Sequence, residues 1–223
     1  MNGGATTTPR MLAATARGLY ADGPPLLRLL TRARPYICPF EILLDCVPSG
    51  SRVLDVGCGG GLLLALLARH RALRQGTGFD SSVTAVALAE RMIEHSGLSG
   101  VVRITRLDAR APWPQGTWDV VALVDVLHHV PPSAQQGVIE NAVQRVAPGG
   151  LLLYKDMAMT PAWCRWMNKL HDLVLARQWI HELPVARVDE WVLARNLSVV
   201  RSESPRRLWY SHDVRVYQRA AAG

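Results

Sequence analysis

The chain has 223 residues, of which 49% are hydrophobic, and this suits one domain with a full apolar core. Its net charge is +7, but the basic side chains are scattered, without a basic run or an RNA-binding signature, which disfavours a nucleic-acid-binding protein. We find no apolar run of 18 residues, no secretion signal over residues 1–8 and no metal-ligand spacing among the four cysteines. These features predict a cytoplasmic protein without a transmembrane segment.

The first fifty residues are predicted to be helical after a disordered start. Residues 1–10 are small and polar, which is typical of a disordered terminus. Over residues 11–33, apolar and basic residues alternate at helical spacing around an Asp-Gly-Pro-Pro break, and this predicts two short helices. A further short helix is expected over residues 41–47.

A glycine-rich turn at residues 57–61 is the central feature of the chain. The apolar strand at residues 53–56 enters it, and the apolar run from Leu62 opens a helix behind it. Glycines let a ligand approach the main chain, and the helix start offers free N–H groups, so the turn predicts a nucleotide-type site. The dinucleotide fingerprint requires glycine at position 62, where Leu62 stands, which disfavours an NAD-dependent oxidoreductase.

Downstream of the turn, strands and helices alternate with short connections. This alternation predicts a parallel sheet built from βαβ units. Strands are expected over 76–79, 101–106, 118–124 and 151–155, helices over 83–95, 131–146 and 186–197, and a closing antiparallel hairpin over 197–203 and 208–219. Acidic residues follow three of these strands, at the sheet edge where open α/β proteins bind ligands.

Several motifs resemble those of one family. The acid-x-Gly-x-Gly-x-Gly pattern from Asp55 to Gly61 resembles the first motif of class I S-adenosylmethionine (SAM)-dependent methyltransferases. Asp108-Ala109 resembles their third motif, and the stretch from Asp125 to Val130 is similar to small-molecule enzymes, including those of quinone biosynthesis. The resemblance implies a Rossmann-like α/β fold with a mainly parallel seven-stranded sheet, an antiparallel C-terminal hairpin and helices on both faces. It also implies SAM as cofactor and S-adenosylhomocysteine (SAH) as product.

The resemblance and the strand ends together give a predicted cofactor site. Asp80 is expected to accept the ribose hydroxyls, with helix capping as its alternative role, and Asp108 to accept the adenine amino group, with an ordinary turn as alternative. Arg34 and Tyr36 are expected to contact the SAM carboxylate or the substrate, or else to be a surface arginine and a packed tyrosine. The complete predicted set is Asp55, Gly57, Cys58, Gly59, Gly61, Asp80, Ser81, Asp108, Ala109, Val124, Asp125, Arg34 and Tyr36.

Histidines are the candidate catalytic residues, because their side chains titrate near neutral pH. His129 is predicted to be a base or a substrate-orienting residue, with His128 behind it, in a catalytic or a packing role. His171 is a second-choice base. A base is needed only where the acceptor is a hydroxyl or a protonated amine. No Asp-Asp-Asn-like cluster of oxygen ligands is found, so no metal is predicted.

We expect one methyltransferase domain over residues 11–223. Residues 11–47 are expected to lie over the cofactor pocket, and residues 156–184, rich in Trp and Met, to form a helical substrate cap. Packing on the sheet and membrane-surface binding are the alternatives for this insertion.

The predicted function is methyl transfer from SAM to a small molecule, expected to be a hydroxyl of an aromatic or acyl metabolite, free or carrier-bound. A homodimer stays open. RNA or protein methylation and a non-catalytic SAM-binding subunit are the alternatives. The Asn/Asp-Pro-Pro-Tyr motif of amino-group enzymes is absent where Val124-Asp125-Val126-Leu127 stands.

Overall fold

The computed structural model describes residues 7–21, 25–158, 181, 183–208 and 210–222. Most of the predicted substrate cap, His171 included, and most of the predicted disordered start lie outside these residues. Within the described part of the chain, none of the helices combines the length and the apolar composition that crossing a membrane requires.

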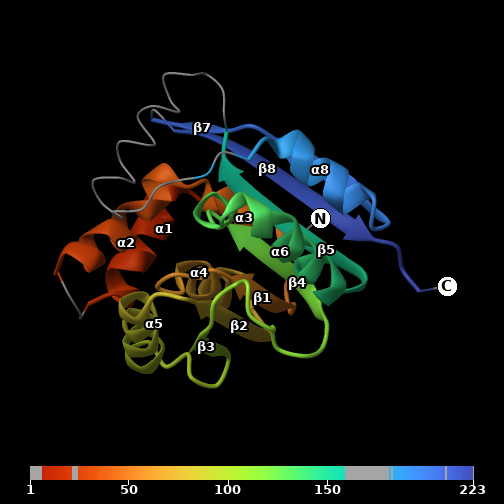
Figure 1. The fold of residues 1–223 in the computed structure, drawn as a ribbon. Helices are drawn as coiled ribbons and strands as arrows, with labels where there is room; N and C mark the ends of the chain where they lie inside the picture. Colours follow the sequence, from red (N-terminus) through yellow and green to blue (C-terminus); the bar gives the residue numbers. More distant parts are fainter. Residues whose placement is uncertain (1–6, 22–24, 159–180, 182, 209, 223) are drawn as a thin grey trace, which may run out of the picture.

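A single sheet runs through the molecule (Figure 1). Among the described residues, the strands of this sheet follow the order β3-β2-β1-β4-β5-β8-β6, and a short β7 also pairs with β8. Neighbours from β3 to β5 are parallel, whereas β8 runs antiparallel to both β5 and β6. The bounds are β1 Arg52–Val56, β2 Gln75–Asp80, β3 Val102–Arg106, β4 Trp118–Val124, β5 Val146–Met157, β6 Leu197–Glu203, β7 Arg206–Arg207 and β8 Tyr210–Arg219. The predicted parallel sheet with a C-terminal antiparallel hairpin is confirmed.

Helices cover both faces of this sheet, as predicted (Figure 1). One face packs against α1 (Pro9–Leu19), α3 (Phe40–Cys46), α4 (Leu62–His70) and α5 (Val83–His95), and α2 (Pro25–Ile37) packs on α1. The other face packs against α6 (Pro132–Arg145) and α8 (Val185–Leu193), with the short 3₁₀ helix η1 (Leu127–His129) after β4. The central strands β1, β4 and β5 supply buried apolar side chains to both faces, so the middle of the sheet is buried between two helical layers.

Some element boundaries follow from local chemistry. Helix α5 begins after Ser82 because the Ser82 hydroxyl accepts the N–H of Ala85 at 3.3 Å. The predicted turn before the fifth strand is wrong in one respect, since residues 148–150 lie inside β5. A register shift against β4, between Trp118 and Val120, accommodates them, and Gly149 takes a positive φ of 74° there. Helix α8 ends earlier than predicted, at Leu193, because the chain turns through Asn196 at φ 62° into β6.

Candidate active site

A cavity of about 580 Å³ opens at the carboxyl ends of the parallel strands. Its walls come from the glycine turn after β1, from the ends of β2 and β3, and from the segment after β4. The lining residues are Arg34, Gly57, Gly59, Asp80, Ser81, Ser82, Leu107, Asp108, Ala109, Arg110, Asp125, Val126, His129, Val130 and Pro131. The position of the cavity agrees with the edge at which open α/β sheets bind ligands.

The glycine turn contributes bare main chain to the cavity. Gly57 and Gly59 have φ values of 65° and 53°, which residues other than glycine rarely adopt. A Cβ atom on Gly57 would come within 2.7 Å of the Val126 side chain, whereas the space beside Gly59 is open. Gly61 has a different task, because a Cβ there would lie 2.5 Å from Ile104, so this glycine lets α4 pack closely on the sheet.

Two carboxylates stand on the cavity wall near the turn. The Asp80 oxygens accept hydrogen bonds from the N–H groups of Gly59 and Ser82, each at 2.8 Å. Asp80 therefore links the glycine turn to the residue that precedes α5. Asp108 accepts bonds from the Arg110 side chain at 2.9 and 2.6 Å. These bonds from Arg110 lower the pKa of Asp108 to about 2, and the carboxylate is therefore ionised at neutral pH.

Asp125 occupies the cavity floor between two cations. One of its oxygens lies 2.8 Å from the Arg34 guanidinium and the other 2.5 Å from the Lys155 ammonium. Burial alone would raise the pKa of Asp125, but Lys155 and Arg34 hold it well below its usual range. The backbone of Asp125 has φ 57°, which is uncommon for residues other than glycine, and its N–H donates to the Lys155 carbonyl at 2.9 Å.

A pair of histidines follows Asp125. His129 opens into the cavity, whereas His128 is buried behind it with the ring centroids 4.0 Å apart. The Nδ1 atom of His128 lies 2.5 Å from a carboxylate oxygen of Asp156 at the end of β5. Desolvation, and after it the charge of His128, lower the pKa of His129 to about 4. His129 is therefore a neutral imidazole at physiological pH, with a lone pair available to a ligand.

Three of these groups have the spacing of a metal site. Asp125, His128 and Asp156 offer ligand atoms within 4.8 Å of one another. Both Asp125 oxygens already bond cations, however, and Nδ1 of His128 points at Asp156. In the described residues this cluster is accordingly a hydrogen-bonded network, and we assign no metal to it.

Sequence comparison places the chain in a family. A family model described as a methyltransferase domain matches residues 26–202. The chain belongs to this methyltransferase family. Its fold and its glycine turn agree with the predicted class I SAM-dependent methyltransferase, and SAM is the cofactor of that class.

Individual relatives agree with this assignment. A ubiquinone biosynthesis O-methyltransferase of Xanthomonas axonopodis pv. citri is 37% identical over 116 residues, which cover 52% of this chain and 46% of the relative. One from Xanthomonas oryzae pv. oryzae is 34% identical over 152 residues, covering 64% of this chain and 56% of the relative. The chain thus spans about half the length of the curated relatives it matches.

Solved structures extend the match to nearly the whole chain. An O-methyltransferase family protein from Burkholderia thailandensis has a TM-score of 0.70 at 25% identity, covering 96% of this chain and 61% of that one. Magnesium protoporphyrin IX methyltransferase from Synechocystis PCC 6803, solved with bound SAH, has a TM-score of 0.69 at 20% identity, covering 93% and 94%. The second likeness shows the fold alone.

The methyltransferase fold brings together many of the predicted site residues and separates others. Cavity-lining positions are Arg34, Gly57, Gly59, Asp80, Ser81, Asp108, Ala109, Asp125 and His129. Buried behind the cavity are Asp55, Cys58, Val124 and His128, whereas Gly61 starts α4 and Tyr36 is exposed outside the lining. Burial raises the pKa of Asp55 to about 8; the charge of Arg34 opposes this rise and the charge of Asp80 adds to it, so Asp55 is largely protonated at neutral pH.

Four residues that bond to the site were not predicted from the sequence, namely Tyr20, Arg110, Lys155 and Asp156. Arg110 lies two residues after Asp108, and this spacing was a usable signal. Lys155 and Asp156 lie near the end of β5, and the pairing of β5 with β4 brings them beside Asp125 and His128.

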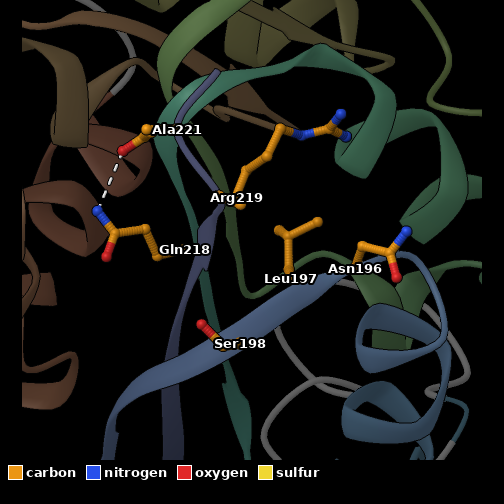
Figure 2. A pocket seen from close by; sticks show the side chains of 8 residues that line it. Asn196, Leu197, Ser198, Gln218, Arg219 and Ala221 are labelled. Carbon is orange, nitrogen blue, oxygen red and sulfur yellow. Dashed lines mark hydrogen bonds between the residues drawn. The ribbon is translucent and has the colours of Figure 1, made fainter. Parts of the chain in front are cut away.

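A second cavity of about 540 Å³ lies at the opposite edge of the sheet, near the start of β5 and the end of β8 (Figure 2). Its lining includes Asn196, Ser198, Gln218 and Arg219, and Gln218 donates to the Gly149 carbonyl at 3.1 Å. Arg219 alone among its lining residues is ionisable, so this cavity holds no acid–base pair.

Proposed function

We propose that this chain transfers a methyl group from SAM to a hydroxyl of a small aromatic or acyl acceptor. The observation that carries the proposal is the shared cavity: bare main chain of Gly57 and Gly59 faces the same space as the neutral imidazole of His129. The relatives named for O-methylation in ubiquinone biosynthesis support an aromatic hydroxyl as acceptor. Because the chain spans only about half the length of those relatives, the identity of the acceptor is part of what we propose.

The cavity residues fit the parts of SAM. Asp80 would accept hydrogen bonds from the ribose hydroxyls, since each carboxylate oxygen keeps a second lone pair beyond its bond to the main chain. Asp108 and Ala109 would face the adenine, and Arg34 with Asp125 the charged aminoacyl end. The space that a Cβ atom on Gly59 would occupy is open, so the cofactor could approach the main chain closely at this residue.

The chain's own residues would align the reaction and handle the proton. SAM, when bound, supplies an electrophilic methyl group that is already activated. Holding an acceptor in line with it accounts for about 7–11 kcal/mol in favourable cases. His129 would accept the hydrogen bond, and then the proton, of the acceptor hydroxyl. Asp156 would orient His128 and offset positive charge on the histidine pair.

Three further features belong to the same proposal. Residues 11–223 would act as one domain. The acceptor would be free or bound to a carrier protein, and a homodimer stays a prediction.

Calorimetry with SAM, SAH and NAD, followed by a methyl-transfer assay, tests the proposal. We expect heat from SAM and SAH and none from NAD. With labelled SAM and a panel of phenols, catechols and hydroxyacyl compounds, we expect a methyl ether identified by mass spectrometry. If RNA or protein became labelled instead, the acceptor would be a macromolecule and not a small molecule. Binding without any labelled product would indicate a SAM-binding subunit, and no heat from SAM or SAH would overturn the proposal altogether.

A further inference from the structure

The glycine turn has a partner from outside the sheet. Tyr20, the residue that ends α1, donates its hydroxyl to the carbonyl of Gly60 at 2.7 Å, across 40 residues of sequence. The Tyr20 side chain is 1% exposed, and its ring lies against the turn, since a Cβ on Gly60 would be 3.7 Å from Tyr20 Cε1. Helix α1 therefore reaches the turn through the Tyr20 side chain, and it also packs on α4.

Tyr20 is itself held in place from both directions. Its N–H donates to the Ala16 carbonyl at 3.0 Å, and its carbonyl accepts two bonds from the Arg32 guanidinium of α2, at 3.1 and 2.5 Å. Burial, followed by the nearby Cys58, raises the pKa of Tyr20 far above its ordinary value. The hydroxyl therefore remains protonated and acts as a donor throughout the physiological range.

The bond from Tyr20 acts on a peptide unit that joins two glycines, Gly60 and Gly61. Gly59 and Gly61 have positive φ values of 53° and 79°, and chains of glycine pass between such conformations at little cost. On one side Asp80 holds the N–H of Gly59 at 2.8 Å. On the other, Tyr20 holds the carbonyl of Gly60, and the N–H of the same peptide donates to the Cys58 carbonyl at 2.9 Å. The direction of this peptide is thus fixed by Tyr20 together with the main chain of Cys58.

We propose that Tyr20 is a positioning residue for cofactor binding, which acts by fixing the Gly60–Gly61 peptide and, through it, the conformation of the turn whose Gly57 and Gly59 line the cavity. The inference rests on the proposed function, because it takes the turn as the SAM site. Without the hydroxyl the glycine turn would sample more conformations when empty, and the binding-competent one would be only a fraction of the population. The effect therefore falls on SAM affinity rather than on the chemical step.

Tyr20→Phe tests this, because it removes the hydroxyl and keeps the buried ring. By calorimetry we expect Kd for SAM and SAH to rise about five- to ten-fold, which corresponds to one typical hydrogen bond. At saturating SAM, kcat and KM for the acceptor should stay near wild type. Hydrogen exchange of the amides at residues 57–61, measured without ligand, should become faster.

Tyr217→Phe is the matched control. Tyr217 lies on β8, outside the cavity lining, and is also fully buried. Its hydroxyl donates to Asp189 of α8 at 2.6 Å. This variant should lose comparable stability and keep wild-type SAM affinity. If wild type binds SAM and Tyr20→Phe binds it equally well, or if both variants weaken binding alike, the positioning role is wrong. If wild type does not bind SAM, the proposed function fails instead, and unchanged exchange at residues 57–61 would still reject the structural role of the hydroxyl.

Discussion

Nδ1 of His128 lies 2.5 Å from Oδ1 of Asp156, and both side chains are more than nine-tenths buried. The same oxygen accepts the N–H of Met157 at 2.8 Å, which fixes the carboxylate on the end of β5. An ionised carboxylate only accepts, so the proton of this bond is on Nδ1 of His128. Since the His128 ring lies 4.0 Å from that of His129, the Asp156 charge acts on the cavity through a histidine pair.

Asp156→Asn should lower turnover by about ten-fold or more, because it removes the charge that offsets a proton on the histidine pair and keeps the side-chain volume. SAM affinity should stay within about two-fold of wild type, because Asp156 does not line the cavity. Steady-state kinetics and calorimetry measure the two quantities. Asp213→Asn is the control, since Asp213 pairs with Asp156 in register on β8 but bonds Ser204. Unchanged kcat in Asp156→Asn would contradict the role of the pair.

The pH profile should reveal the depressed pKa of His129. An unperturbed histidine, with a pKa of about 6.5, would lose roughly ten-fold in its unprotonated fraction between pH 7.5 and 5.5. With its pKa lowered to about 4, His129 stays unprotonated over that range and loses its lone pair only as the pH falls further. We therefore expect kcat/KM to be nearly flat from pH 7.5 to 5.5, with far-UV circular dichroism confirming the fold. A drop centred near pH 6.5 that persists in His129→Gln would exclude His129 as the proton acceptor.

Asp80→Ala should weaken SAM binding by about ten-fold or more, because it removes the acceptor proposed for the ribose and frees the N–H of Gly59. Calorimetry measures the effect. Asp119→Ala is the matched control: it removes a carboxylate that accepts the N–H of Arg52 at 2.7 Å outside the cavity lining, and SAM affinity should be unchanged. Equal SAM affinity in Asp80→Ala and wild type would remove Asp80 from the site.

The order of elements could be predicted from the sequence because local signals agree with the tertiary fold. Helix α5 and strand β4 have the predicted bounds, since a cap residue or a continuous apolar run marks their ends. Strand β5 begins earlier than predicted, because a bulge against β4 absorbs the Pro-Gly-Gly segment that in isolation favours a turn.

The partners of the site residues were harder to predict. Glycines and acids at strand ends carry a local signal, and those at 57, 59, 80 and 108 line one cavity. Asp156 pairs with a histidine 28 residues away, however, and Tyr20 with a carbonyl 40 residues away. Such contacts depend on strand order and helix packing, which hydrophobic periodicity does not specify.

Lys155→Met tests the energetics of the cavity floor. Lys155 is 1% exposed, and its ammonium lies 2.5 Å from Asp125, so its loss leaves a partly buried carboxylate paired with Arg34. We expect about 3 kcal/mol of destabilisation in urea titrations, because removal of one partner of a buried pair exposes the cost of desolvating the other. Adding Asp125→Asn should restore most of this loss.

The loss of stability in Lys155→Met should also depend on pH. Because the folded-state pKa of Asp125 lies below its unfolded value of about 3.9, the ion pairs stabilise the fold above about pH 4, and the contribution disappears as the pH falls through the folded pKa. The difference between wild type and Lys155→Met should therefore be largest near neutrality and shrink in acid. A difference that is independent of pH between 3 and 7 (roughly one unit below to three above the unfolded pKa) would show that packing of the lysine stem, rather than its charge, holds Asp125 in place.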